Sequence, residues 1–355
     1  IKPQPAGEFD SLAGLILALA IGGAGIHCSI RSTALAKGRL SRFFDLPVSM
    51  FSLLFHAYHA RSPALIGIEK RYSGMTETIQ SLEDLRREID GIDAAMHELI
   101  LRRTRVVTRI AAAKDETGGA NFVPGREARV LRQLLARHDG PFPRPALARI
   151  WREMISVYAA MQGPYALVAY ADGDDQTCWD LARDQFGNHG AMTALSNSRD
   201  VVARVFSGEA ALGVVPIPHD DDADCWWRAL CVADAPRIVA RLPFVPGGNA
   251  RGGDAGAYAI ARVPLDASGD DRTLLVIESE DAIRREILRE LLDHVGLRAG
   301  AIVSRHEEIW MHLIEVDGFL APNDPVLGRL GETPAVSRAC AIGGFAVPIA
   351  APAAA

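Results

Sequence analysis

The sequence has few cysteines, and they form no pattern that would bind a metal. It has five, which are odd in number and widely scattered, with no C-x-x-C pair and no histidine cluster at zinc spacing: Cys28, Cys178, Cys225, Cys231 and Cys340. This scatter favours a reducing cytoplasmic location and predicts no structural metal. We interpret the five residues as ordinary small apolar side chains.

Long basic runs and long apolar runs are missing too. The net charge is -6, and no basic block is long enough to follow a phosphate backbone, so we predict no nucleic-acid partner. The apolar run at residues 12–26 is shorter than the ~20 residues that a membrane-spanning helix needs and lacks the flanks of a signal peptide, so we predict no membrane partner. With 49% hydrophobic residues in 355, the chain can still bury a core, and its length favours two domains plus extra sequence.

The first seventy-odd residues show no persistent helical or strand period. A strongly periodic segment begins shortly after Met75, which therefore looks like a natural start. We interpret residues 1–74 as upstream sequence outside the native fold and predict no structure for them.

A long helix is predicted from Ser81 to about residue 115. Ser81 is a suitable N-cap, and the apolar residues that follow alternate in steps of three and four, as in a coiled-coil seam. The seam consists of Leu82, Leu85, Ile89, Ile92, Met96, Leu99, Val106 and Ile110. One helix cannot bury such a stripe against itself, so we expect partner helices and an intertwined helical dimer.

One position of this seam holds a cation, and two further cations stand on the same helix. Arg103 stands at a seam position, and Lys114 follows three turns later on nearly the same face, with Ile110 between them. Because an unpaired buried cation is costly, an anionic partner is expected. Arg86, 17 residues before Arg103, faces a quarter-turn away and would serve a different pocket, which in a symmetric dimer can be the partner's.

Two shorter helices are predicted after the long one. The first covers residues 126–138 and ends before Asp139-Gly140-Pro141, a strong stop signal. The second begins near Pro145 and ends at Gly163. Gln162 lies on the apolar face of this last helix, where an amide would point into the interior.

These three segments resemble the all-helical chorismate mutase family. The resemblance is carried by LRREIDGIDAAMHELILRRTRVVTRIAAAK, PGREARVLRQLL and IWREMISVYAAMQ, and it covers a domain at residues 75–163. It implies a three-helix fold in an intertwined dimer with shared active sites, and the rearrangement of chorismate to prephenate in the synthesis of phenylalanine and tyrosine. This isomerase reaction is unimolecular, so the resemblance implies no cofactor and no metal.

The resemblance also implies roles for individual residues. Arg103 and Arg86, the latter from the other protomer, would bind the two carboxylates of chorismate. Lys114 and Gln162 would donate hydrogen bonds to the ether oxygen, where negative charge grows as the C–O bond breaks. We expect Arg103, Lys114, Gln162 and a fourth residue, Glu127, to line one cavity.

Five further positions of the expected pocket follow from the same comparison. Glu127 would accept a hydrogen bond from the ring hydroxyl, helped by Arg126, and Ile110 would contact the substrate. Val123 stands where the family usually has an aspartate, and Tyr158 where it has serine or threonine. Both positions belong to the pocket wall, and the cations are unchanged. We therefore expect these two residues to affect turnover and substrate fit.

The chain after Gly163 has β character and predicts an α/β region, so that the whole is an α+β multidomain protein. Residues 165–265 resemble the first lobe of prephenate dehydratase in a degenerate form, with a VVPI segment followed by Pro218-His219 and no Thr-Arg-Asp-Thr signature. Residues 270–350 show a β-α-β-β pattern that resembles an amino-acid-binding regulatory (ACT-type) domain, with Ser304-Arg305 in a matching place. An aromatic amino acid is therefore a candidate effector.

Two alternatives to a mutase alone stay open. One is a bifunctional chorismate mutase and prephenate dehydratase, against which the missing signature argues. The other is a non-catalytic regulatory protein that senses aromatic amino acids, in which Val123 and Tyr158 have silenced the pocket.

Overall fold

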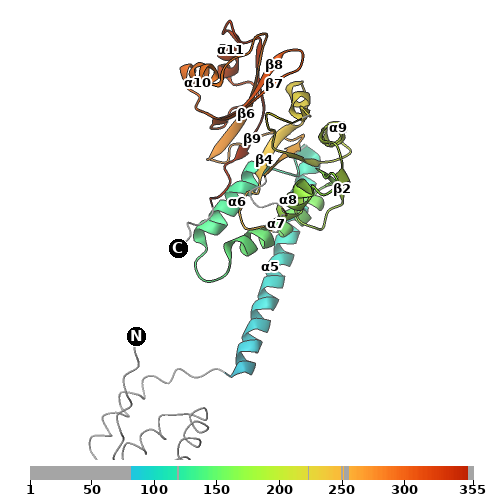
Figure 1. Ribbon diagram of the computed structural model, residues 1–355. Coiled ribbons are helices and arrows are strands. Elements are labelled where there is room, and N and C mark those ends of the chain that lie inside the picture. The colour runs from blue at the N-terminus through green and yellow to red at the C-terminus, as the bar shows by residue number, and fades with distance from the viewer. Residues whose placement is uncertain (1–80, 118–119, 223, 249–250, 252–255, 351–355) are drawn as a thin grey trace, which may run out of the picture. The chain divides into compact units, whose positions relative to one another are not determined.

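The computed structural model describes residues 81–117, 120–222, 224–248, 251 and 256–350 (Figure 1). Its contacts group the chain into two units, residues 1–91 and residues 92–355. The predicted upstream segment, residues 1–74, lies outside the described residues, and so does Cys28.

Three helices come first, and each prediction for them is confirmed to within a few residues. They are α5 (Leu82–Thr117), α6 (Pro124–Arg137) and α7 (Arg144–Ala160). Ser81 caps α5 as expected: its hydroxyl accepts a hydrogen bond from the Asp84 amide at 3.1 Å, while the Asp84 carboxylate accepts one from the Ser81 amide at 3.2 Å. This reciprocal pair satisfies two N–H groups that would otherwise have no partner.

The apolar seam of α5 is largely exposed within the single chain. Eight of its members are between 41% and 64% exposed: Leu82, Leu85, Ile89, Ile92, Met96, Leu99, Val106 and Ile110. Monomeric proteins rarely leave a continuous apolar stripe of this length in water, because burying it is strongly favourable.

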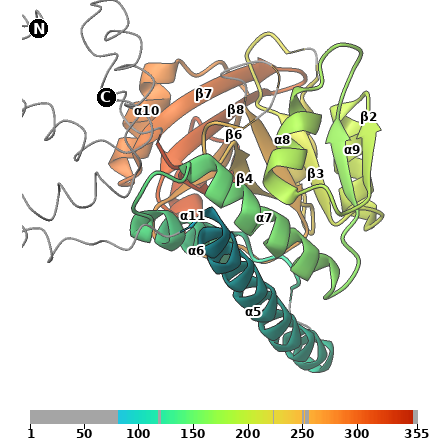
Figure 2. The ribbon, with the colours of Figure 1, turned by 90° about the horizontal axis from the view of Figure 1, so that it is seen from below.

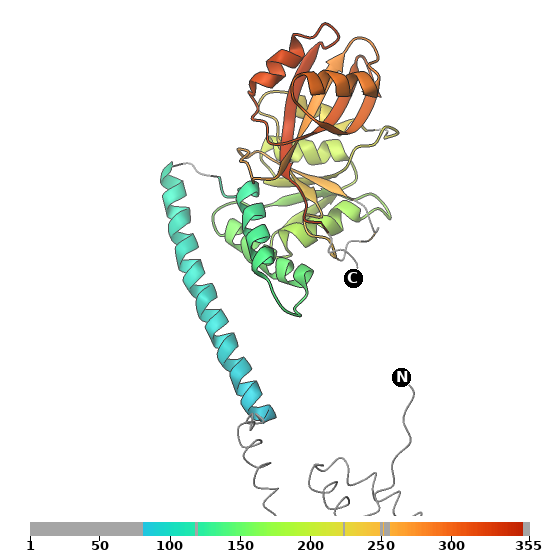
Figure 3. The same ribbon diagram turned by 90° about the vertical axis from the view of Figure 1, so that its left-hand side faces the viewer.

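The apolar faces of α6 and α7, by contrast, are covered by the rest of the chain. Leu131 and Leu135 lie one turn apart on α6 and are at most 1% exposed. They pack in one cluster with Ala148 of α7 and with Phe244 and Val245 from the region that follows. The two helices therefore rest on the α/β region, as the views in Figure 2 and Figure 3 show.

The α/β region is built on a mixed sheet of nine strands. Their order is β2-β1-β3-β5-β4-β9-β6-β8-β7. The strands β1, β2 and β3 run parallel to one another, and β4 makes a parallel contact with β9. All other neighbouring strands pair antiparallel. The bounds are β1 (Leu167–Tyr170), β2 (Met192–Leu195), β3 (Leu212–Pro216), β4 (Arg237–Leu242), β5 (Ala257–Ala261), β6 (Asp271–Ser279), β7 (Ala299–His306), β8 (Trp310–Asp317) and β9 (Arg338–Ala346).

Helices cover both faces of this sheet. Alternate residues of each strand point to opposite sides, so each face can pack its own helices. Leu167 and Ala169 of β1 pack under α8 (Thr177–Phe186), whereas Val168 between them packs with α9 (Ser198–Ser207) and the 3-10 helix η1 (Trp226–Cys231). Under the other half of the sheet, α10 (Arg285–His294) and α11 (Pro325–Gly331) bury a third cluster.

The last six elements, β6-α10-β7-β8-α11-β9, form a β-α-β-β-α-β unit. Within the sheet its strands follow the order β9-β6-β8-β7, which is the ferredoxin-like arrangement. The sequence pattern predicts the first four of these elements and misses α11 and β9. This unit shares both sheet and core with residues 165–265, so the predicted boundary near residue 270 separates two halves of one sheet.

The contact that joins the halves is a close approach of two backbones. Gly343 of β9 pairs with Ile238 of β4, at a φ of +155°. A Cβ placed at Gly343 would lie 2.3 Å from the Ile238 carbonyl oxygen, so only glycine fits there.

Candidate active site

Lys114 lies in the last turn of α5 and points at the end of α7. Its Nζ donates to Oε1 of Gln162 at 2.9 Å and to the backbone carbonyl of Ala120 at 2.5 Å. Partial burial lowers the pKa of Lys114, and the positive charge of Arg126 lowers it further. An ammonium has three N–H donors, so two are engaged here and the third is available to a ligand.

Gln162 follows directly after the C-cap of α7, Met161, and its amide is held at both ends. Oε1 accepts from Lys114, and Nε2 donates to the Tyr158 carbonyl at 2.8 Å. The predicted inward-facing amide therefore contacts the predicted cation, although 48 residues separate them in the chain.

Tyr158 ties α7 to α5. The side chain is 6% exposed, its hydroxyl donates to the Ile100 carbonyl at 3.2 Å, and the Thr104 hydroxyl lies 3.3 Å away. A serine or threonine at this position would be too short to make this bridge. The substitution thus places an aromatic ring in the predicted pocket wall.

Arg103 lies against this ring. Its guanidinium carbon is 4.6 Å from the centre of the Tyr158 ring, within the range of a cation–π contact. Nη1 of Arg103 is buried and has no hydrogen-bond partner in the described part of the chain. Because a buried N–H donor without an acceptor is unfavourable, an anionic ligand would stabilise this arrangement.

Four further predicted residues are Ile110, Arg126, Val123 and Arg86, and they differ in exposure and in the unit to which they belong. Ile110 is 43% exposed on α5, Arg126 is exposed in the first turn of α6, and Val123 is half-buried at its N-cap. Arg86 belongs to the other unit, where its guanidinium lies 3.9 Å from Glu83 on an exposed surface.

Glu127 lies in a different place from the one expected. It lines a cavity of about 20 Å³ with Gln185, Val239 and Phe244 of the α/β region, and none of the three residues Arg103, Lys114 and Gln162 lines that cavity. Burial raises the pKa of Glu127 to about 7, against the opposing effect of the Arg152 guanidinium. Lys114 and Gln162 thus contact each other directly, Arg103 and Gln162 share Tyr158 as a neighbour, and Glu127 lines a cavity with residues of the α/β region.

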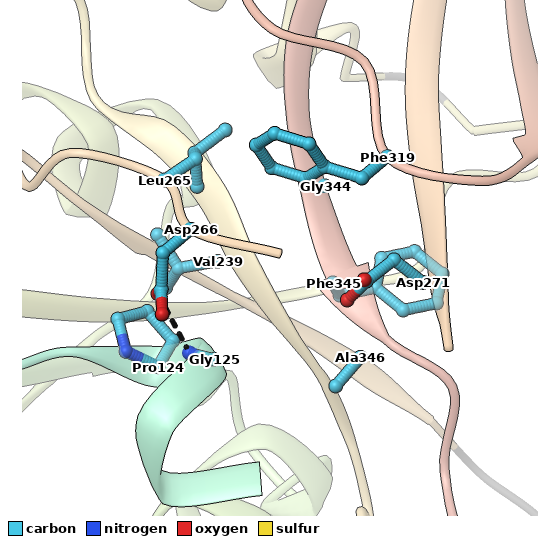
Figure 4. A pocket seen from close by; sticks show the side chains of 10 residues that line it. All are labelled: Pro124, Gly125, Val239, Leu265, Asp266, Asp271, Phe319, Gly344, Phe345 and Ala346. Carbon is cyan, nitrogen blue, oxygen red and sulfur yellow. Dashed lines mark hydrogen bonds between the residues drawn. The ribbon is translucent and has the colours of Figure 1, made fainter. Parts of the chain in front are cut away.

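The α/β region also supplies the cap of α6. Val123, the N-cap residue, makes no side-chain hydrogen bond, and Oδ1 of Asp266 instead accepts from the amide of Gly125 at 3.1 Å (Figure 4). A Cβ at Gly125 would lie 2.6 Å from the Asp266 carbonyl, so the approach needs a glycine. Asp266 also pairs with Arg129 at 3.0 Å.

Among the described residues, no group of three or more histidine, cysteine or acidic side chains is placed to hold a metal ion. No helix in the same residues is long and apolar enough to cross a membrane. The arrangement at α5 and α7 consists of two cations and one amide beside a buried aromatic ring. Such a group can bind carboxylates and stabilise growing negative charge on an oxygen.

A family model described as chorismate mutase type II matches residues 85–163. Residues 85–163 are a chorismate mutase type II domain. The domain contains α5 from residue 85 onwards, the whole of α6 and α7, and every predicted site residue. It is followed by the nine-stranded α/β region.

The relatives that this chain matches include proteins named as bifunctional and as single-function. The bifunctional chorismate mutase/prephenate dehydratase of Pseudomonas aeruginosa is 31% identical over 146 residues, which are 40% of this chain and 40% of that protein. An intracellular chorismate mutase of Mycolicibacterium smegmatis is 41% identical over 64 residues, 17% of this chain and 62% of that protein. The match thus spans about two fifths of the length of the bifunctional relatives.

Among solved structures, the prephenate dehydratase of Arthrobacter aurescens in complex with L-Phe covers 53% of this chain. The likeness takes in 92% of that chain at 14% identity, with a TM-score of 0.40.

Two features of the chorismate mutase domain were not predicted from the sequence. The Tyr158 bridge to Ile100 was missed, since a tyrosine on an apolar helix face gives no signal of which carbonyl its hydroxyl will reach. The cap from Asp266 was missed because it comes from 141 residues away. The one available signal was Val123, whose side chain cannot cap a helix.

Proposed function

We propose that this protein rearranges chorismate to prephenate in its helical domain. The observation that carries the proposal is the hydrogen bond of 2.9 Å between Lys114 and Gln162, within the segment that matches chorismate mutase type II. The family resemblance implies that both residues donate to the ether oxygen, and their hydrogen bond joins α5 to the residue that follows the C-cap of α7.

The chemistry of the rearrangement suits these groups. The substrate must be held in a compact conformer while the C–O bond breaks and the C–C bond forms within the same molecule. The buried Nη1 of Arg103, which has no hydrogen-bond partner among the described residues, is a site for one carboxylate, and its neighbours supply donors. The third N–H of Lys114, together with a rotated Gln162 amide, would stabilise the charge that grows on the ether oxygen.

Binding of the second carboxylate requires Arg86 from another copy of the chain. Arg86 precedes Lys114 by 28 residues on α5, which corresponds to ~42 Å along a helix, so both cannot serve one site from one chain. The exposed seam of α5 supports a partner, because a second α5 packed along it would bury those apolar side chains. We therefore propose a homodimer with shared sites.

The predicted contact of Glu127 with the ring hydroxyl stays a prediction. Glu127 lines a cavity with residues of the α/β region and not with Arg103, Lys114 or Gln162. The proposal consequently rests on Arg103, Lys114 and Gln162 rather than on Glu127 or Arg126.

The first test is turnover of chorismate by the full chain and by Lys114→Ala. The substitution removes a donor that matters chiefly in the transition state, so kcat should fall by about 10²- to 10³-fold while helical circular dichroism stays unchanged. Loss of chorismate and formation of prephenate are followed by NMR. Arg137→Ala, at the exposed end of α6, is the matched control and should retain wild-type turnover. Equal turnover in Lys114→Ala and the control would reject the proposed site.

The same reaction separates the alternatives. Phenylpyruvate among the products would indicate a dehydratase activity as well, and no turnover at all would favour the regulatory protein. Repeating it with phenylalanine and with tyrosine tests the predicted aromatic effector, for which the ferredoxin-like unit of residues 271–346 is the candidate site.

A further inference from the structure

Two cysteines that lie far apart in the sequence lie side by side in the fold. Cys231 is the last residue of η1 and is 6% exposed, and Cys340 is a half-buried residue of β9. Their side chains lie close enough for each to shift the pKa of the other. Cys231 belongs to the core cluster that runs across the two halves of the sheet, and Cys340 packs against that cluster.

Two arginines hold the segments that carry these cysteines together. Nη1 of Arg237 donates to the Leu230 carbonyl at 2.9 Å and to the Ala341 carbonyl at 3.3 Å, so it bridges the neighbours of both cysteines. Arg338, two residues before Cys340, donates to the carbonyl of Cys231 itself. The backbones beside the two thiols are thus fixed relative to each other by side chains from β4 and β9.

The charges around the pair distinguish its two members. The hydrogen bond from Cys231 lowers the pKa of Cys340, and the nearby Arg338 and Arg237 lower it further, against the effects of burial and of Glu278. The same hydrogen bond and burial raise the pKa of Cys231. A thiolate is the reactive form of cysteine, so Cys340, which is also the more exposed, is the expected nucleophile.

We propose that Cys231 and Cys340 are a redox-active pair that closes to a disulfide on reaction with a hydroperoxide. The Cys340 thiolate attacks the terminal oxygen of the peroxide, the O–O bond breaks, and the leaving oxygen takes a proton, which gives a sulfenic acid and water or an alcohol. The sulfur of Cys231 then attacks the Cys340 sulfur, forms the S–S bond and displaces the hydroxyl, which leaves as water with the thiol proton. Two thiols are oxidised by two electrons and one peroxide is reduced.

This pair differs from the other described cysteines. Burial raises the pKa of Cys178 to about 12 and that of Cys225 to about 11, so both stay protonated and unreactive near neutral pH. They provide internal controls in the same molecule. The pair is independent of the proposed mutase site, and its reaction goes beyond that function.

The test is peptide mapping of the full chain after treatment with hydrogen peroxide. The oxidised protein is alkylated, digested without reduction and analysed by mass spectrometry. We expect a dithiothreitol-reversible link between the Cys231 and Cys340 peptides in material that runs as a monomer in non-reducing electrophoresis, with Cys178 and Cys225 still alkylated. Cys340→Ser should abolish the link and leave Cys231 alkylated, whereas Cys178→Ser should not change it.

Other outcomes overturn the proposal. They are a link that joins a different pair, a link only between two copies of the chain, and oxidation of Cys340 that stops at the sulfenic acid or proceeds to the sulfinic acid without a link. The wild-type map suffices for this decision, so it stands even where a variant folds poorly.

Discussion

At the scale of single residues, the environment of Glu127 opposes the charge that a carboxylate carries at neutral pH. Burial against the α/β region raises its pKa from 4.5 to about 7, and the Arg152 guanidinium only partly offsets this. Arg152 is itself 5% exposed, and two of its nitrogens, Nε and Nη2, have no hydrogen-bond partner in the described residues. The protonation of Glu127 therefore makes the packing of α6 and α7 against the α/β region depend on pH.

The sign of this linkage follows from proton binding. Between pH 4.5 and about 7 the folded state keeps the Glu127 proton that the unfolded state has lost, so the free energy of unfolding falls as the pH rises. The shift corresponds to roughly 3 kcal/mol, present in full below pH 4.5 and lost as the pH passes 7. Glu127→Gln should remove this part of the pH dependence. Urea unfolding of both proteins at pH 5, 6, 7 and 8 measures it, and parallel curves would contradict the pKa of Glu127.

At the scale of elements, α6 depends on a residue outside its own domain for its N-terminal cap. Its N-cap position holds Val123, where the resembling family usually has an aspartate, and Asp266 accepts the Gly125 amide in its place. An acidic group at this end of a helix also interacts favourably with the helix dipole. The α/β region thus supplies a cap that α6 cannot make for itself.

This substitution of one cap for another can be tested by a double-mutant cycle. Asp266→Ala should lower the free energy of unfolding by about 1 kcal/mol or more, because it removes the cap and the ion pair with Arg129. Val123→Asp should recover part of that loss in the Asp266→Ala protein and have little effect in the wild type. Asp139→Ala, in the exposed loop after α6, is the control. Equal effects of Val123→Asp in both backgrounds would show that the two positions are independent.

Local sequence patterns predict the helices of this fold better than its strands. The three helices were predicted to within a few residues, because long periodic segments with clear caps and stop signals carry local information. The strands β2, β4, β5 and β9 were missed, since their pairing depends on partners far along the chain and leaves no local period. The site shows the same limit: Lys114 and Gln162 meet as expected, but Glu127 lines a cavity with Phe244 and Gln185, which no pattern around α6 reveals.

At the scale of the whole molecule, the proposed dimer divides each site between two chains. Arg86 would come from one copy and Arg103, Lys114 and Gln162 from the other. A two-fold symmetric dimer then contains two such sites. A substitution that both chains carry therefore damages the same half of each site. Two inactive variants that damage different halves of the site should therefore form one intact site when their chains pair in a mixed dimer.

Mixing Arg86→Ala with Lys114→Ala, followed by unfolding and refolding together, tests this division. Half of the dimers would be mixed, each with one intact site and one doubly defective site, so the mixture should recover about a quarter of wild-type chorismate turnover. Mixing Arg103→Ala with Lys114→Ala is the matched control: both substitutions affect the same half, every site in a mixed dimer keeps one defect, and no activity should return. If the first mixture were no more active than its parents, Arg86 would not serve the partner's site. Recovery in both mixtures would show that Arg103 and Lys114 do not act together, and would reject the site built on α5 and α7.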